Sequence, residues 1–222
     1  MKRSEINSLL KDTLNFFKEQ KFALPKWATW SPENWKESPE LSAKMKSLQL
    51  GWDVTDFGTK DFYKTGLILF CLRNGNLKNK SSKPYAEKIM VVREDQETPL
   101  HFHTFKEEDI INRGGGKLVL ELYHKNSDGQ LDTESNVIAS IDEIETTVKP
   151  GEKIILETGQ SITLSQNIFH RFYGLKGEGK VLTGEVSRVN DDLIDNTFLK
   201  APGRFAQIEE DESPLYPLWS EL

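Results

Sequence analysis

The segment TPLHFHTFKEEDIINRGGG, residues 98–116, contains two histidines and a glutamate at a spacing that suits a metal site. His101 and His103 are two residues apart, so both imidazoles point to the same face of an extended strand. A turn after the second histidine would return the carboxylate of Glu108 to that face. His170 lies much further along the chain in another strand-like context. Three imidazole nitrogens and one carboxylate oxygen suit an octahedral Mn, Fe, Co or Ni ion, whereas tetrahedral zinc would leave less space for a chelating substrate.

The composition predicts one globular domain. The chain has 222 residues, of which 36% are hydrophobic and 29% are charged, so it is neither a disordered tail nor a membrane span. Asp and Glu number 35 against 29 Lys and Arg, which gives a net charge of −6. Nucleic acids and anionic membranes require a concentrated basic surface, so we expect neither as the main partner. A small-molecule ligand is the better expectation.

A single cysteine limits both the redox chemistry and the metal chemistry. Cys71 has no partner for an intramolecular disulfide, and a zinc site built on thiolates is excluded. Its apolar run, Leu67–Leu72, is much shorter than the roughly 20 residues needed to span a bilayer, and predicts a buried strand. The first residues, Met1–Glu5, include two basic side chains, but no continuous apolar segment follows. We therefore expect a cytoplasmic protein.

Residues 1–60 predict a helical and aromatic arm. An amphipathic helix is expected from Ser4, as N-cap, to about Glu19, because apolar residues recur at three- and four-residue steps: Ile6, Leu9, Leu10, Leu14 and Phe17. A tryptophan-rich segment follows and is expected to cover one open face of a sheet. Within it, Ser31-Pro32 predicts the start of a short helix, because serine is a good cap and proline suits the first helical position.

Residues 61–189 predict a barrel core of short strands. Turn signals such as Asn74-Gly75 and Asp128-Gly129 separate apolar runs that we expect to be strands: Gly66–Leu72, Lys88–Val92, Lys117–Tyr123, Val137–Ser140, Lys153–Leu156, Ser161–Leu164 and Lys180–Val186. Many short strands without long intervening helices indicate a sandwich or barrel. Residues 190–222 are irregular, with an acidic run at 209–212, and are expected to wrap the outside of the barrel. All three parts form one domain, 1–222.

The spacing of the candidate ligands resembles the two motifs of the cupin superfamily. In the first motif the two histidines are followed by Glu108 and Gly115; in the second, Gly159 and Asn167 precede His170, with asparagine where glycine is usual. The segments 98–116, 184–192 and 204–212, together with the opening Met1–Asn7, are similar to the D-lyxose ketol-isomerase family of cupins. The resemblance implies a mainly β, jelly-roll barrel. It also implies a homodimer in which His101, His103, Glu108 and His170 hold Mn²⁺, with Co²⁺, Fe²⁺, Ni²⁺ or Zn²⁺ as alternatives.

The implied reaction is the interconversion of D-lyxose and D-xylulose, and also of D-mannose and D-fructose. A proton must move between C1 and C2, and a divalent ion that chelates both oxygens would stabilise the developing enediolate. Proton transfer needs a further group, and Glu185 is the candidate base because it lies on an apolar strand that can face the barrel interior. Lys106 is the second catalytic candidate, as a donor to a substrate oxygen. The candidates for binding the sugar hydroxyls are Lys88, Asp195 and Arg204.

Other functions are compatible with the same residues. Cupin dioxygenases and decarboxylases use three histidines and one glutamate, and a non-catalytic sugar-binding cupin could keep the barrel without a proton-transfer group. A phosphosugar would need a cationic cluster that the sequence does not identify, which favours an unphosphorylated substrate. The order of preference among aldoses depends on the placement of single hydroxyl contacts, which spacing does not reveal.

Overall fold

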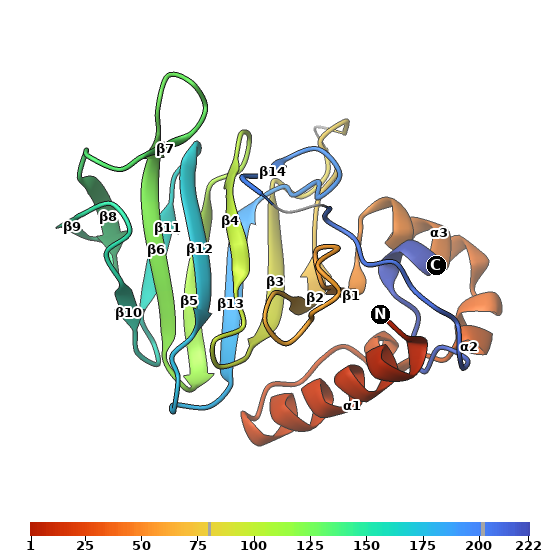
Figure 1. Ribbon diagram of the computed structural model, residues 1–222. Coiled ribbons are helices and arrows are strands. Elements are labelled where there is room, and N and C mark those ends of the chain that lie inside the picture. The colour runs from red at the N-terminus through yellow and green to blue at the C-terminus, as the bar shows by residue number, and fades with distance from the viewer. Residues whose placement is uncertain (80, 201–202) are drawn as a thin grey trace.

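Two β-sheets pack face to face in the computed structural model, which describes residues 1–79, 81–200 and 203–222 (Figure 1). The first sheet has eight strands in the order β1 (Gly51–Thr55), β2 (Leu67–Arg73), β3 (Tyr85–Val92), β13 (Val181–Arg188), β5 (Glu108–Gly115), β11 (Ser161–Leu164), β8 (Val137–Ile141) and β9 (Ile144–Val148). The second has six: β10 (Ile154–Leu156), β6 (Leu118–Lys125), β12 (Ile168–Gly174), β4 (Thr98–His103) and β14 (Asn196–Phe198), with β7 (Leu131–Asp132) paired to β6. The predicted mainly β architecture is confirmed.

Burial on both faces explains the apolar runs of β2 and β3. Leu67, Leu69 and Cys71 point between the two sheets, whereas Ile68 and Phe70 point to the opposite face of the eight-stranded sheet. Strand β3 alternates in the same way. Each fully buried aliphatic side chain adds roughly 1.5–3 kcal/mol to the stability of the fold, because its apolar surface is removed from water. These strands therefore form the rigid wall between the barrel interior and the helical arm.

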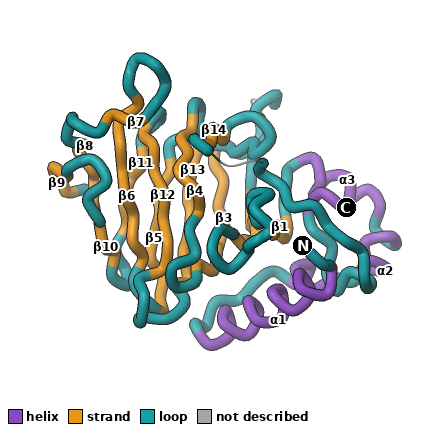
Figure 2. Tube along the Cα trace, in the orientation of Figure 1, coloured by secondary structure: helices purple, strands orange, loops and turns teal. Residues whose placement is uncertain are grey.

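The outer face of this wall is covered by the N-terminal arm, which is helical as predicted (Figure 2). Helix α1 (Arg3–Glu19) buries its apolar stripe, and short helices follow at Lys26–Thr29, α2 (Pro32–Lys36) and α3 (Pro39–Ser47). Ser31 caps α2 by accepting a hydrogen bond from the Asn34 amide at 3.4 Å. The expectation that Ser4 caps α1 is wrong, because its hydroxyl instead donates to Asp211 Oδ2 at 2.7 Å.

The C-terminal segment runs back along α1. The buried guanidinium of Arg3 pairs with the carboxylates of Glu210 and Glu221, and the Asn7 amide donates to Glu212 Oε1 at 2.6 Å. A short helical turn, Trp219–Glu221, ends the chain. Residues 201 and 202 of the expected tail lie outside the described residues. In the part of the chain that is described, no helix combines the length and the apolar character required to cross a membrane.

Candidate active site

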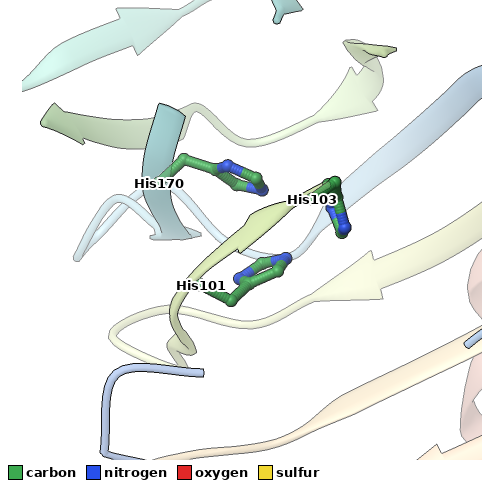
Figure 3. Close-up of side chains that lie close together, drawn as sticks. All are labelled: His101, His103 and His170. Atoms are coloured by element: carbon green, nitrogen blue, oxygen red, sulfur yellow. The ribbon is translucent and has the colours of Figure 1, made fainter. Parts of the chain in front are cut away.

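Three histidines converge from two neighbouring strands of the six-stranded sheet (Figure 3). His101 and His103 lie on β4, and His170 lies directly opposite His101 on β12. The ring centroid of His101 is 4.2 Å from that of His170 and 4.9 Å from that of His103. One ring nitrogen from each histidine lies within 4.8 Å of the other two, which is close enough for all three to bind one metal ion.

Backbone hydrogen bonds fix the orientation of two imidazoles. His101 Nδ1 lies 2.8 Å from the carbonyl oxygen of Pro99, and His170 Nδ1 lies 3.0 Å from that of Ile168. A carbonyl oxygen only accepts, so Nδ1 carries the proton and Nε2 keeps its lone pair. Among the described residues, the buried Nε2 atoms of His103 and His170 have no hydrogen-bond partner. Such unpartnered nitrogens fit metal coordination, since burying an unpaired polar atom otherwise costs about 1–3 kcal/mol.

Burial also favours the neutral form of His101 and His103. Desolvation, followed by the charges of the neighbouring imidazoles of His170 and His103, holds the pKa of His101 well below 6.5. Desolvation and then the ammonium of Lys106 lower the pKa of His103. Neutral imidazole is the form that binds a metal ion, so these two shifts favour metal binding.

Glu108 reaches the same place from the eight-stranded sheet. Its Oε1 lies 3.3 Å from His103 Nε2 and 3.2 Å from His170 Nε2. Burial opposes its ionisation, but the nearby charges of Lys106 and His103 outweigh that effect and hold the carboxyl pKa well below its usual value. Glu108 is therefore an anion beside the three histidines. The four side chains are a donor set that fits a divalent cation.

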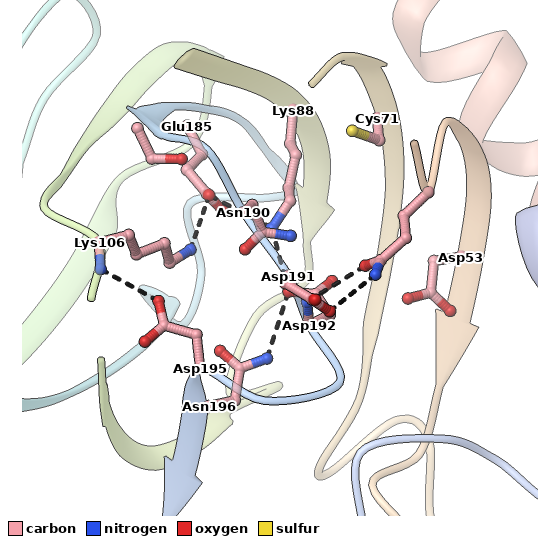
Figure 4. Close-up of polar contacts among 12 residues, drawn as sticks. Asp53, Cys71, Lys88, Lys106, Glu185, Asn190, Asp191, Asp192, Asp195 and Asn196 are labelled. Atoms are coloured by element: carbon pink, nitrogen blue, oxygen red, sulfur yellow. Dashed lines mark hydrogen bonds and ion pairs between the residues drawn. The ribbon is translucent and has the colours of Figure 1, made fainter. Parts of the chain in front are cut away.

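From Glu108 a chain of alternating charges crosses the interior of the protein. Figure 4 shows its middle part, with Lys106, Glu185, Lys88 and Asp192. Lys106 Nζ lies 2.6 Å from Glu108 Oε2 and 2.8 Å from Glu185 Oε1. The next contacts are Glu185 Oε1 to Lys88 Nζ at 3.3 Å and Lys88 Nζ to Asp192 Oδ1 at 3.4 Å. Arg204 Nη2 completes the chain, 2.8 Å from Asp192 Oδ2 and 2.6 Å from Asp53 Oδ2. Because the partners alternate in sign, each buried charge is compensated by its neighbours.

The strand register decides the direction of the Glu185 side chain, which the sequence left open. On β13, Glu185 pairs with Lys88 of β3 on one side and with Ile110 of β5 on the other. Its carboxylate points into the barrel and is 5% exposed. Lys88, Lys106, Glu185 and Arg204 therefore line one pocket together with His101, His103 and Glu108.

Asp195 does not line this pocket. Its carboxylate instead accepts hydrogen bonds from the backbone amides of the loop that carries Lys106. The site residues expected from the sequence did not include Asp53 and Asp192, which belong to the ionic chain, or pocket-lining residues such as Asn196 and Phe198. The sequence did contain a pointer to Asp192, because this residue ends the family-like segment 184–192. Its ionic partners, Lys88 and Arg204, lie in two other parts of the chain.

The turn that leads into β12 contains an asparagine in the left-handed region of backbone conformation. Asn167, which stands where glycine is usual, has φ +63°. Asparagine is one of the few residues with a side chain that enters this left-handed region readily. Its backbone N–H donates to the carbonyl oxygen of His103 at 2.9 Å, which ties the turn to the end of β4.

Known proteins resemble this chain over its whole length. The family model described as D-lyxose isomerase matches residues 1–222. A D-lyxose/D-mannose isomerase of Serratia proteamaculans is 46% identical over 100% of this chain and 97% of its own length, and one of Escherichia coli O157:H7 is 44% identical over 100% and 98%. The L-ribose isomerase of Cellulomonas parahominis, solved with L-ribose, shares the fold with a TM-score of 0.62 at 15% identity, covering 94% of this chain and 98% of that one. The chain thus belongs to the D-lyxose isomerase family and is a sugar isomerase.

Proposed function

We propose that the protein interconverts D-lyxose with D-xylulose, and D-mannose with D-fructose, with the help of a divalent metal ion. The two relatives described as D-lyxose/D-mannose isomerases support the substrates. The observation that carries the proposal is the carboxylate of Glu185, which lies in the same pocket as His101, His103 and Glu108 but is not one of the candidate metal ligands. An aldose–ketose isomerase needs such a base in addition to its metal site.

The reaction moves protons only. From aldose to ketose, a proton leaves C2, a proton arrives at C1, and a hydroxyl proton passes from the oxygen on C2 to the oxygen on C1, so neither oxidant nor reductant is consumed. A divalent ion held by His101, His103, Glu108 and His170 would supply Lewis-acid polarisation of the two sugar oxygens.

The residues of the chain supply the remaining steps. Glu185 takes the proton from carbon and returns it to the neighbouring carbon, a contribution that is typically worth about 10²- to 10⁴-fold in rate. Lys106 Nζ holds the Glu185 carboxylate at 2.8 Å and can donate to a substrate oxygen beside it. Lys88 and Arg204, which are buried at the same pocket, are placed to donate hydrogen bonds to sugar hydroxyls.

Glu185→Gln tests the assignment of the base. The variant keeps the shape of the side chain but cannot accept a proton, so turnover of D-lyxose should fall about 10²- to 10⁴-fold. Metal content, measured by elemental analysis of the purified variant, should stay at the wild-type level. The control is Glu87→Gln on β3, because Glu87 is more exposed and does not line the pocket. Full turnover by Glu185→Gln would contradict the assignment.

An anaerobic assay separates isomerisation from oxygen chemistry. Manganese-loaded protein should convert D-lyxose to D-xylulose without oxygen. Turnover that requires ferrous iron and oxygen would instead indicate a dioxygenase, and binding of sugar without any turnover would indicate a storage or binding protein.

We further propose manganese as the native metal and a homodimer in the cytoplasm as the working state. Elemental analysis of protein purified without added metal tests the first point. Light scattering at micromolar concentration tests the second, and cell fractionation tests the third.

A further inference from the structure

The carboxylate of Asp195 is occupied by three consecutive backbone amides. Oδ1 accepts the N–H of Thr104 at 2.9 Å and of Phe105 at 2.7 Å, and Oδ2 accepts the N–H of Lys106 at 3.1 Å. The residue is 2% exposed, and its side chain makes no ion pair with a lysine or arginine among the described residues. Three of its roughly four acceptor positions are thus used within the protein, which leaves little capacity for a sugar hydroxyl.

These three amides belong to the loop that connects β4 to β5. The loop begins after His103 and ends at Glu108, so both of its ends are candidate metal ligands. In its middle lies Lys106, whose side chain bridges Glu108 and Glu185. A shift of this loop would move the ammonium relative to both carboxylates.

Asp195 is itself rigidly held. Its backbone N–H donates to the carbonyl oxygen of Asp191 at 3.1 Å, and the side chain of Asp191 accepts a hydrogen bond from Gln49 Nε2 at 2.8 Å. The preceding residue of this segment, Asn190, donates its N–H to Asn74 Oδ1 at 3.0 Å. The anchor is therefore tied to residues next to β1 and β2, and the following residue, Asn196, pairs with His103 at the start of the loop.

The charge of Asp195 also faces a candidate ligand. His103 Nδ1 lies 4.0 Å from Asp195 Oδ2, too far for a hydrogen bond but close enough for the negative charge to favour a proton on Nδ1. That tautomer leaves the lone pair on Nε2, the nitrogen beside Glu108.

We propose that Asp195 is a positioning residue that anchors the 104–106 backbone, so that Lys106 stays between Glu108 and Glu185. This inference rests on the proposed function. The sequence predicted that Asp195 binds a sugar hydroxyl. Under the proposal it acts instead through the loop, by keeping Lys106 in position for catalysis.

Hydrogen exchange of the wild-type protein tests the anchor independently of activity. A peptide covering residues 104–107 lies in a loop, yet its amides should exchange slowly because Asp195 holds three of them. In Asp195→Ala these amides should exchange at least about tenfold faster, since each lost hydrogen bond is worth about 0.5–1.5 kcal/mol. Fast exchange in the wild type would overturn the proposal, whether or not the protein isomerises sugars.

The kinetic test compares two variants at Asp195 with a matched control. Asp195→Ala should lower kcat about 10- to 100-fold, as expected for slight misplacement of a catalytic group, with KM changed less than about threefold. Asp195→Asn keeps an oxygen for the Thr104 and Phe105 amides and loses only the bond from Lys106, so it should recover most of kcat. The control is Asp132→Ala, because Asp132 likewise accepts two backbone amides, those of Glu134 and Ser135, but on the exposed turn after β7.

The outcomes separate the possible roles. A raised KM with unchanged kcat would assign Asp195 to substrate binding and overturn the proposal. Equal losses in the Asn and Ala variants would show that the charge matters and the backbone anchor does not, which also overturns it. An unchanged kcat in a folded Asp195→Ala variant does the same. If the wild type turns over no aldose, the proposed function fails, while hydrogen exchange still decides whether the anchor exists.

Discussion

Replacing Lys106 with methionine should destabilise the protein more than any exposed lysine replacement. The side chain of Lys106 is 2% exposed, and its ammonium lies 2.6 Å from Glu108 Oε2 and 2.8 Å from Glu185 Oε1. Burial alone would lower the pKa of Lys106, but the three nearby carboxylates of Glu108, Glu185 and Asp192 raise it above the usual 10.5. Lys106→Met keeps most of the volume but removes the charge that lies between the buried carboxylates of Glu108 and Glu185.

The size of the effect follows from two opposing contributions. Two charges at these separations attract by about 6 kcal/mol per contact at an effective dielectric constant of about 20. Desolvation of the ions opposes this attraction by several kcal/mol per ion. The net cost of removing one partner from a buried pair is about 3–5 kcal/mol, because the remaining charge is left without compensation. We expect Lys106→Met to lower the free energy of unfolding by that amount.

The measurement is urea unfolding of metal-free protein at neutral pH, followed by the fluorescence of buried tryptophans such as Trp52. A chelator must be present, because a bound cation would compensate Glu108 in place of Lys106. Lys180→Met is the matched control: Lys180 pairs with Asp12 at 2.7 Å but is 34% exposed, so its loss should cost less than about 1 kcal/mol.

A second substitution tests whether Lys106 stabilises the protein by compensating the charge of Glu108. In the wild type, Glu108→Gln removes a partner of Lys106 and should be destabilising. In the Lys106→Met background the same change removes an uncompensated buried carboxylate and should raise the free energy of unfolding. If Glu108→Gln lowers stability equally in both backgrounds, or if Lys106→Met is as stable as Lys180→Met, the charge compensation described here is refuted.

Three further predictions concern other parts of the fold. Burial alone would raise the pKa of Asp12, but the charges of Lys180 and Arg93 outweigh burial and lower it. Asp12→Asn should therefore reduce the free energy of unfolding in urea by less than about 1 kcal/mol at neutral pH. This difference should vanish as the pH falls below 3.8 and the wild-type carboxylate is protonated, and a difference that stays constant would contradict the prediction. Burial raises the pKa of the Cys71 thiol to about 12, so an aromatic disulfide reagent should modify it only in unfolded protein. Asn167→Val should cost about 1–2 kcal/mol because φ is +63°, whereas Asn167→Gly should be nearly neutral; equal thermal stability of the two variants would be the opposing result.

Many strands of the two sheets could be predicted, because they are apolar and are separated by turn signals. The run at Leu67–Leu72 is buried on both faces, and Ser161–Leu164 coincides with β11. Strand β1 could not be predicted in this way, because Gly51–Thr55 contains a glycine and an aspartate and falls within the residues expected to form the helical arm. Its pairing with β2, from Gly51 opposite Cys71 to Thr55 opposite Leu67, makes it a strand.

The candidate site shows the same limit. The histidine pair could be placed on one face because the period of a strand is two, and Glu108 is near in sequence. The orientation of Glu185 depends on its register with β3 and β5, and the contacts of Asp195 are made with amides in a distant loop. Residue type therefore suggested Asp195 as a site residue, but only tertiary structure distinguishes a ligand for sugar from an anchor for backbone.

The charges of the site bear on the proposed role of a metal ion at the histidines. The ionic chain begins and ends with a carboxylate: four acids, Glu108, Glu185, Asp192 and Asp53, alternate with three bases, Lys106, Lys88 and Arg204, so the set carries four negative and three positive charges. With neutral imidazoles, its net charge is −1, and negative charge developing on a sugar in this pocket would be repelled. A divalent cation next to Glu108 changes the sum to +1, which favours that charge. Under the proposed function, a metal ion at the histidines would therefore make this pocket favourable to the negative charge that develops on the sugar.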